Sequence, residues 1–216
     1  MKYDLVIFDL DGTLLDTLND LAAAANYVLR EAGFPIHPTE DIRRFIGNGA
    51  ANMIRCAAPA GTPQERLDEL LARFKERYSA HVNDRTRPFN GVPELLHDLR
   101  RAGVRAAVNS NKPAGPTALL CEAHFPGLLE MAVGERPDTP RKPAPDGALH
   151  IMRALGVPPE RTIYVGDGDA DLLTARNAGV DSAWVSWGYR RRDELAGLEI
   201  PRSFDSAAEL GSFLLS

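Results

Sequence analysis

A short apolar run near the N-terminus leads directly into two aspartates, and this arrangement limits the folds open to the chain. Four consecutive apolar residues, Leu5–Phe8, predict a strand buried on both faces, as in a parallel sheet. Asp9 and Asp11 follow, and Gly12 permits a sharp turn. If the extended conformation persists, the two carboxylates lie close together and repel, which favours one ionised and one protonated group. Such a pair suits a nucleophile and a general acid, whereas the alternative is a strand followed by an Asp-rich turn.

Two further apolar runs end in polar residues in the same way. Val104–Val108 leads into Asn109-Ser110-Asn111-Lys112, and Thr162–Val165 leads into the acidic stretch from Gly166 to Asp171. In open α/β sheets, ligands bind outside the carboxyl ends of the strands. The sequence therefore predicts an α/β sheet in which three strands direct polar residues toward one crevice.

The stretch between Asp16 and Asp84 carries helical patterns and no strand-like run. The glycine-flanked segment Gly47-Asn48-Gly49 separates two of the expected helices. Thr62-Pro63-Gln64-Glu65 predicts the start of a long helix, because it combines a capping box with proline at the first helical position. An all-helical block inserted after the first strand of an α/β sheet indicates a separate small domain.

Four short motifs then occur in a fixed order along the chain. Asp9-Leu10-Asp11-Gly12-Thr13 fits the pattern DxDGT, and Gly166–Asp171 fits GDxxxD. Between them lie Ser110, after a predicted strand, and Lys142, within a proline-rich loop. In this order and spacing the chain resembles the haloacid dehalogenase superfamily of phosphatases, and most of all the phosphoglycolate phosphatase family. Gly168 departs from the pattern, since many relatives have Ser there, and we expect this difference to change the fine tuning of the site and not its chemistry.

The resemblance implies a Rossmann-like parallel sheet with helices on both faces and an inserted helical cap domain. We place the α/β core at residues 1–14 and 85–216 and the cap at residues 15–84. The segments Arg43–Ala50 and Thr86-Arg87-Pro88 resemble the cap of phosphoglycolate phosphatases.

The implied chemistry is Mg²⁺-dependent hydrolysis of a small phosphate monoester through an aspartyl phosphate. Asp9 is the expected nucleophile and Asp11 the general acid and base, while Asp171 acts through water or by holding Lys142. Mg²⁺ prefers hard oxygen ligands, which Asp9, Asp167 and the backbone carbonyl of Asp11 would supply. Ser110 and Lys142 would hold the phosphoryl oxygens. The full set expected to bind the substrate is Gly12, Thr13, Ser110, Asn111 and Lys142, with Gly47, Asn48 and Gly49 of the cap.

The resemblance favours conversion of 2-phosphoglycolate to glycolate, but other activities keep the same motifs. A dehalogenase is disfavoured because it lacks the second aspartate, here Asp11. A phosphatase for a sugar phosphate, such as a cell-wall amino sugar 6-phosphate, stays open, as does a phosphomutase that protects its aspartyl phosphate from water. A scaffold that binds phosphate without catalysis is the alternative outside enzymes.

The composition and charge of the chain limit the kinds of partner that it can bind. The chain has 216 residues, enough for one domain and a small insertion, and its net charge of -5 argues against a nucleic-acid partner. Early acids at Asp4 and Asp9 argue against a signal peptide or membrane span, so the expected location is the cytoplasm, as a monomer or homodimer. Trp184 and Trp187 are interpreted as packing groups rather than a substrate platform.

Overall fold

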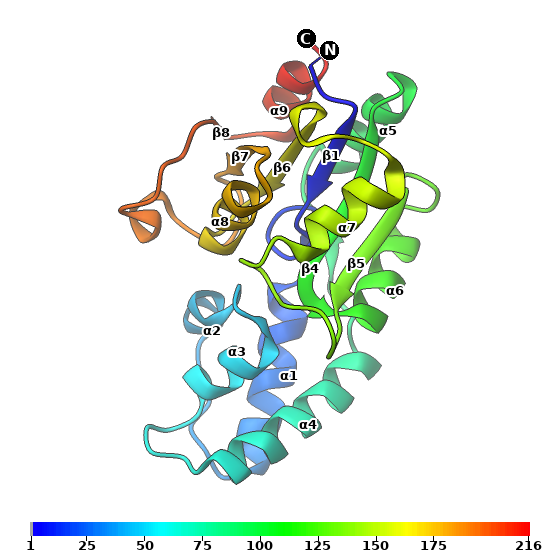
Figure 1. Ribbon diagram of the computed structural model, residues 1–216. Coiled ribbons are helices and arrows are strands. Elements are labelled where there is room, and N and C mark those ends of the chain that lie inside the picture. Colours follow the sequence, from blue (N-terminus) through cyan, green and yellow to red (C-terminus); the bar gives the residue numbers. More distant parts are fainter. Residues whose placement is uncertain (1) are drawn as a thin grey trace. The chain divides into compact units, whose positions relative to one another are not determined.

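A computed structural model describes residues 2–216, which divide into two compact units (Figure 1). One unit comprises the residues through Leu15 together with Pro88–Ser216, and the other comprises Asp16–Arg87. The divisions therefore fall after Leu15 and Arg87, close to the boundaries expected from the sequence. The function of the second unit as a cap stays a prediction.

The larger unit is built on a parallel sheet whose strand order is β5-β4-β1-β6-β7-β8 in the described chain. Its strands are β1 (Leu5–Phe8), β4 (Arg105–Pro113), β5 (Met131–Glu135), β6 (Thr162–Gly166), β7 (Asp181–Val185) and β8 (Ser203–Phe204). In β1, Val6 pairs with Ala106 on one side and with Ile163 on the other. Because β1 is central and each of its residues is at most 1% exposed, the predicted strand buried on both faces is confirmed.

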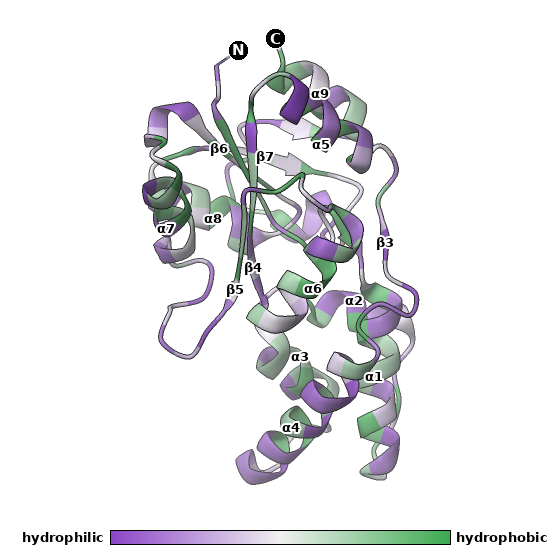
Figure 2. Ribbon diagram, turned by 90° about the vertical axis from the view of Figure 1, so that its right-hand side faces the viewer, coloured by the Kyte–Doolittle hydropathy of each residue, from purple (hydrophilic) through white to green (hydrophobic). Residues whose placement is uncertain are grey.

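Helices cover both faces of this sheet, which confirms the predicted fold class (Figure 2). The helices α7 (Asp146–Leu155) and α8 (Asp169–Ala178) lie on one face, and α5 (Val92–Arg101), α6 (Ala114–His124) and α9 (Ala207–Leu214) lie on the other. The order runs outward from β1 to β5 in one direction and from β6 to β8 in the other. The strand order therefore reverses between β1 and β6, and in such sheets ligands bind at that point.

The second unit is helical, as expected from its sequence. It contains α1 (Leu18–Glu31), α2 (Thr39–Phe45), α3 (Gly49–Ala57) and α4 (Gln64–Ala80). Two short strands, β2 (Leu15–Asp16) and β3 (Arg87–Pro88), pair where the chain passes between the units. Among residues 2–216, no helix is both long and apolar enough to cross a lipid bilayer.

One buried carboxylate joins the beginning and the end of the helical unit. Asp20, in the first turn of α1, is 3% exposed. Its oxygens accept hydrogen bonds from the backbone N–H of Arg85, at 2.9 and 3.1 Å, and of Thr86, at 2.9 Å. The Thr86 hydroxyl donates a further bond at 2.9 Å. We call this group of three residues the Asp20 clasp.

The structure corrects the predicted start of α4. Thr62 does not cap this helix, because no side chain accepts from its first turn. The Thr62 hydroxyl donates to the carbonyl oxygen of Pro59 at 2.6 Å, within a turn that precedes the helix. Pro63 is the N-cap residue, with an extended backbone at φ −59° and ψ 148°, and α4 begins at Gln64. The predicted capping box is therefore wrong, although the long helix itself is confirmed.

The other differences concern short or shifted elements. The apolar run that begins at Leu128 becomes a strand only from Met131, as β5 (Met131–Glu135), because the N–H of Leu128 closes a turn onto the Phe125 carbonyl at 3.0 Å. The sequence analysis did not predict β8 and α9. The strand β8 has two residues, which is too short to show a periodicity in the sequence. The start of α9 could have been predicted from its N-cap residue, Ser206, whose hydroxyl accepts from the Glu209 N–H at 3.2 Å. Short single-turn helices occur at Pro159–Arg161 and Arg192–Leu195.

Candidate active site

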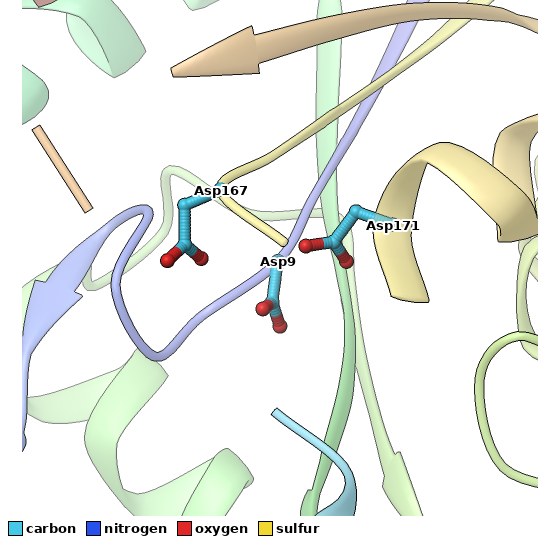
Figure 3. A group of neighbouring side chains, drawn as sticks. All are labelled: Asp9, Asp167 and Asp171. Carbon is cyan, nitrogen blue, oxygen red and sulfur yellow. The ribbon is translucent and has the colours of Figure 1, made fainter. Parts of the chain in front are cut away.

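Three carboxylates converge at the point where the strand order reverses. Asp9 follows β1, Asp167 follows β6, and Asp171 lies in the first turn of α8 (Figure 3). One oxygen from each residue lies within 4.8 Å of the others. Their exposures are 9%, 4% and 3%, respectively, so the group is largely withdrawn from water. This geometry brings together three acidic residues that the sequence analysis assigned to one crevice.

Lys142 supplies positive charge to this group, as the motif order predicted. Its Nζ lies 2.8 Å from Asp9 Oδ1 and 2.7 Å from Asp171 Oδ1, and its side chain is 3% exposed. Burial lowers the pKa of Lys142, but the charges of Asp171 and Asp9 outweigh burial and hold this pKa well above its ordinary value. Lys142 is therefore a fixed cation between two carboxylates and not a solvated surface lysine.

Burial also acts on the carboxylates themselves. It raises the pKa of Asp9 to about 8, with Lys142 opposing the shift and the charges of Asp171 and Asp167 adding to it. It raises the pKa of Asp167 to about 6, helped by Asp171 and opposed by a hydrogen bond from the backbone of Tyr189. A further cation at the site would therefore favour the ionised form of Asp9.

The loop that carries Lys142 is fastened to the end of β4. The Asn111 side chain accepts from the Lys142 N–H at 2.9 Å and donates to the Lys142 carbonyl at 3.2 Å. This reciprocal pair sets the start of the Lys142 side chain, so the structure gives Asn111 a positioning contact. Ser110 is 6% exposed, and its hydroxyl accepts from the N–H of Lys112 at 3.2 Å. The predicted substrate contacts of Ser110 and Asn111 stay predictions.

Asp11 is not part of the carboxylate group described above, and the expected close pair of Asp9 and Asp11 stays a prediction. The strand β1 ends at Phe8, and the chain then turns, with the N–H of Gly12 donating to the Leu15 carbonyl at 2.9 Å. The regular strand therefore ends before Asp9, and the turn begins after Asp11. The carboxylates whose charge raises the pKa of Asp9 are Asp171 and Asp167.

Asp11 instead forms an ion pair with Lys112, a residue that the sequence analysis did not assign to the site. Lys112 Nζ lies 2.9 Å from Asp11 Oδ1, and the two side chains are 2% and 14% exposed. The site therefore contains a second buried cation, Lys112, in addition to Lys142. The signal that could have found Lys112 is its place in the polar stretch after the apolar run of β4.

Gly12 and Thr13 line the same turn. Gly12 has φ +89°, a left-handed conformation that favours glycine. Thr13 is 1% exposed, and its hydroxyl donates to Asp167 Oδ1 at 3.2 Å. The hydroxyl of Thr13 therefore contacts an acidic residue of the site, and its predicted contact with substrate stays a prediction.

The remaining predicted residues belong to the helical unit. Gly47 and Gly49 both have positive φ, at 119° and 81°, so the chain does break between α2 and α3 as predicted. Asn48 is the residue between them and precedes α3. Their role toward a substrate stays a prediction. Gly168 has room for a larger residue, since a Cβ there would lie 3.4 Å from Asp171 Oδ2.

A sequence profile described as "Haloacid dehalogenase-like hydrolase" matches residues 6–185, which include all of the strand ends described above. The chain belongs to this family of hydrolases. A phosphoglycolate phosphatase from Caulobacter vibrioides is 38% identical over 188 residues, which cover 85% of this chain and 79% of that protein. Such relatives identify this member of the haloacid dehalogenase-like family as a phosphoric monoester hydrolase.

Solved structures of the haloacid dehalogenase-like family show the same fold. A putative phosphoglycolate phosphatase from Lactobacillus delbrueckii subsp. bulgaricus is 34% identical, with a TM-score of 0.94 over 100% of this chain and 99% of that one. A mutant of CbbY from Rhodobacter sphaeroides, in complex with xylulose-(1,5)bisphosphate, is 26% identical, with a TM-score of 0.78 over 97% and 96% of the two chains.

Proposed function

We propose that the protein hydrolyses 2-phosphoglycolate to glycolate and phosphate in a Mg²⁺-dependent reaction, with an aspartyl phosphate on Asp9 as intermediate. The observation that carries the proposal is the position of Asp9. Its carboxylate lies at the end of the central strand, 2.8 Å from the buried ammonium of Lys142 and beside Asp167 and Asp171. A nucleophile at this place meets a dianionic ester with a cation already in position.

The residues present fit a divalent cation of the Mg²⁺ type. Mg²⁺ takes oxygen ligands and commonly uses one or two carboxylates, with waters and a substrate phosphate completing its shell. Asp9 and Asp167 would provide the carboxylates and the backbone of Asp11 a carbonyl, while Asp171 is already bonded to Lys142 at 2.7 Å. When bound, the cation would offset the negative charge that the phosphate brings to this acidic site.

In the proposed reaction, a carboxylate oxygen of Asp9 attacks phosphorus in line with the ester oxygen. The bond from Asp9 to phosphorus forms as the ester P–O bond breaks, and Asp11 gives a proton to the departing alkoxide. Water then attacks the phosphorus of the aspartyl phosphate, and the bond from phosphorus to Asp9 breaks as Asp11 takes a proton from that water, which releases phosphate and restores the Asp9 carboxylate. Lys142 and Ser110 would hold the phosphoryl oxygens as charge spreads over them.

The substrate is supported by the relatives named phosphoglycolate phosphatase, and a second candidate by the complex of CbbY with a sugar bisphosphate. Hydrolysis of a sugar phosphate is therefore the runner-up, and it would use the same chemistry on Asp9. The two proposals differ only in which group of the ester, beyond its phosphate, the protein recognises.

The first experiment measures phosphate release from a panel of esters. We expect the highest kcat/KM for 2-phosphoglycolate, with lower values for an amino sugar 6-phosphate and a sugar bisphosphate. Excess EDTA should stop release and added Mg²⁺ should restore it. Activity that persists in EDTA would contradict the metal role of Asp9 and Asp167, and a sugar ester isomerised without free phosphate would indicate a phosphomutase. If no ester is hydrolysed, the protein is a scaffold and the proposal fails.

A second prediction concerns the break at Gly47-Asn48-Gly49. We expect Asn48→Ala to change the ratio of kcat/KM between 2-phosphoglycolate and a sugar phosphate, because two glycines with positive φ let the backbone approach a substrate closely. Hydrolysis of p-nitrophenyl phosphate should change less. Asn52→Ala is the matched control, since Asn52 lies on α3 and bonds to Arg55. Equal losses on all esters would show that the break has a structural role alone.

A further inference from the structure

We infer that the segment Trp184–Tyr189, at the end of β7 and just beyond it, is a positioning element that fixes the carboxylate of Asp167 for metal binding. The inference rests on the proposed function, since it takes Asp167 as a metal ligand. The sequence suggested packing roles for both tryptophans of this segment. Trp184 is packed in a buried cluster with Leu172 and Leu195, as interpreted. In addition, the indole N–H groups of both tryptophans donate hydrogen bonds to the backbone of the active-site loops.

The segment holds Asp167 directly at two places. Trp184 Nε1 donates to the backbone carbonyl of Asp167 at 2.8 Å, and Trp184 is 4% exposed. The backbone N–H of Tyr189 donates to Asp167 Oδ2 at 2.6 Å. One contact fixes the main chain of Asp167 and the other fixes its carboxylate.

The segment also acts through the turn after β1. Trp187 Nε1 donates to the carbonyl of Thr13 at 3.0 Å. The Thr13 hydroxyl in turn donates to Asp167 Oδ1 at 3.2 Å. Each oxygen of Asp167 thus receives a donor, Oδ1 from Thr13 and Oδ2 from Tyr189, and the segment supplies the second donor and contacts the residue that supplies the first. A carboxylate oxygen has two lone pairs, so each oxygen keeps one for a cation.

Two glycines close the remaining space around this carboxylate. A Cβ at Gly188 would lie 2.2 Å from Asp167 Cβ and 2.4 Å from the Gly12 carbonyl oxygen. A Cβ at Gly12 would lie 2.6 Å from Asp167 Oδ2. Real Cβ atoms do not come this close to other atoms, so only glycine fits at either position without displacing Asp167.

These contacts predict that the segment sets metal affinity rather than the chemical step. Groups that orient a metal ligand commonly change metal affinity or activity by about 10–100-fold when they are removed. Because the segment touches Asp167 and Thr13, its loss should move the carboxylate while Asp9 and Lys142 keep their own contacts.

The test measures binding of Mn²⁺, as a spectroscopic substitute for Mg²⁺, to the full-length protein by the electron paramagnetic resonance signal of the free ion. We expect Trp187→Phe, which keeps an aromatic ring and loses the N–H, to weaken Mn²⁺ binding about 10-fold, and Gly188→Ala to weaken it about 100-fold. The Mg²⁺ concentration for half-maximal activity should rise by similar factors, while kcat at saturating Mg²⁺ changes little in Trp187→Phe. Ser186→Ala is the matched control, because its hydroxyl bonds to Asp205 on the surface, and it should bind Mn²⁺ normally.

The variant Asp167→Asn distinguishes a failure of the proposed metal site from a failure of the positioning role. If Asp167→Asn binds Mn²⁺ as the unmodified protein does, Asp167 is not a metal ligand and the proposed site fails with this inference. If Asp167→Asn loses Mn²⁺ but Trp187→Phe binds it normally, the proposed site stands and the positioning role of the segment is overturned. A fall in melting temperature of Trp187→Phe with unchanged Mn²⁺ affinity has the same meaning. Gly188→Ala adds to the test if it folds, and Trp187→Phe decides the outcome if it does not.

Discussion

Asp9→Asn is expected to lower the rate of phosphate release by a factor on the order of 10⁴–10⁶, as for the loss of a nucleophile in other covalent mechanisms. The amide has nearly the shape of the carboxylate, and its oxygen can still accept from Lys142 and from the N–H of Leu10. Its nitrogen and oxygen are poor nucleophiles toward phosphorus. The measurement is release of inorganic phosphate from 2-phosphoglycolate at saturating Mg²⁺.

The fold should survive this change, and the pH dependence of stability checks that expectation. The pKa of Asp9 is about 8 in the folded protein, against an ordinary value of 3.8. Between these pH values the folded state holds the proton more tightly than the unfolded state, so the contribution of Asp9 to stability falls as pH rises from 4 to 8. Asn does not titrate, so in EDTA the melting temperature of Asp9→Asn should fall less over this range.

A control on the same strand separates chemistry from folding. Asp4 lies just before the opposite end of β1 and pairs with Arg161 at 2.5 Å, on the surface. Asp4→Asn should therefore keep full activity. If Asp9→Asn kept the rate of the unmodified protein, water would have to attack the ester directly and the covalent route would be excluded.

Asp11→Asn is expected to accumulate the aspartyl phosphate, because its two proposed duties fall on two separable steps. A general acid matters when the leaving group is an alkoxide and matters little when it is p-nitrophenolate, which is stable as an anion. The mutant should therefore still be phosphorylated by p-nitrophenyl phosphate. Dephosphorylation lacks its base, and a positioned base is worth about 10²–10⁴-fold.

Rapid-quench mixing measures this outcome. We expect a burst of nitrophenolate near one equivalent per enzyme followed by slow turnover, and no burst with an alkyl phosphate. Lys112 loses its ion pair with Asp11 in this variant, and removing one charge of a buried ion pair destabilises a protein. The double variant Asp11→Asn with Lys112→Met removes both charges and should show the same burst in a more stable protein. Full steady turnover of both esters by Asp11→Asn would show that Asp11 has no catalytic role.

The sheet and the acidic group could be predicted because both follow from local patterns. The apolar runs that became β1, β4 and β6 each end in polar residues, and parallel strands bring such ends to one edge. Asp171 follows Asp167 by one helical turn, so its position near Asp167 could also be predicted from the sequence. Lys142 needed the family resemblance, since nothing local distinguishes a site lysine from any other loop lysine.

The rest depended on contacts that no local pattern reveals. The pairing of Asp11 with Lys112 joins the turn after β1 to the end of β4, and no local pattern connects these two segments. The contacts of Trp187 with Thr13 join residues 174 positions apart, and the aromatic side chain alone predicts packing and not a hydrogen bond to a distant carbonyl. Capping at Thr62 was predicted from residue types, but Thr62 lies in a turn bonded to the Pro59 carbonyl, and α4 begins only after Pro63.

The Asp20 clasp has a consequence for how the chain can be altered. It fastens the first turn of the helical unit to the residues at which that unit ends, through Arg85 and Thr86. The entropy lost on closing a loop grows only slowly with its length, so an insertion whose two ends are already joined adds little cost to the sheet that receives it. For the chain between β1 and α5, closing the whole insertion therefore costs about as much entropy as closing a short turn. We therefore expect that recombination or design can replace the segment between Asp20 and Arg85 with one of different length. The condition is that the clasp still holds the two ends together.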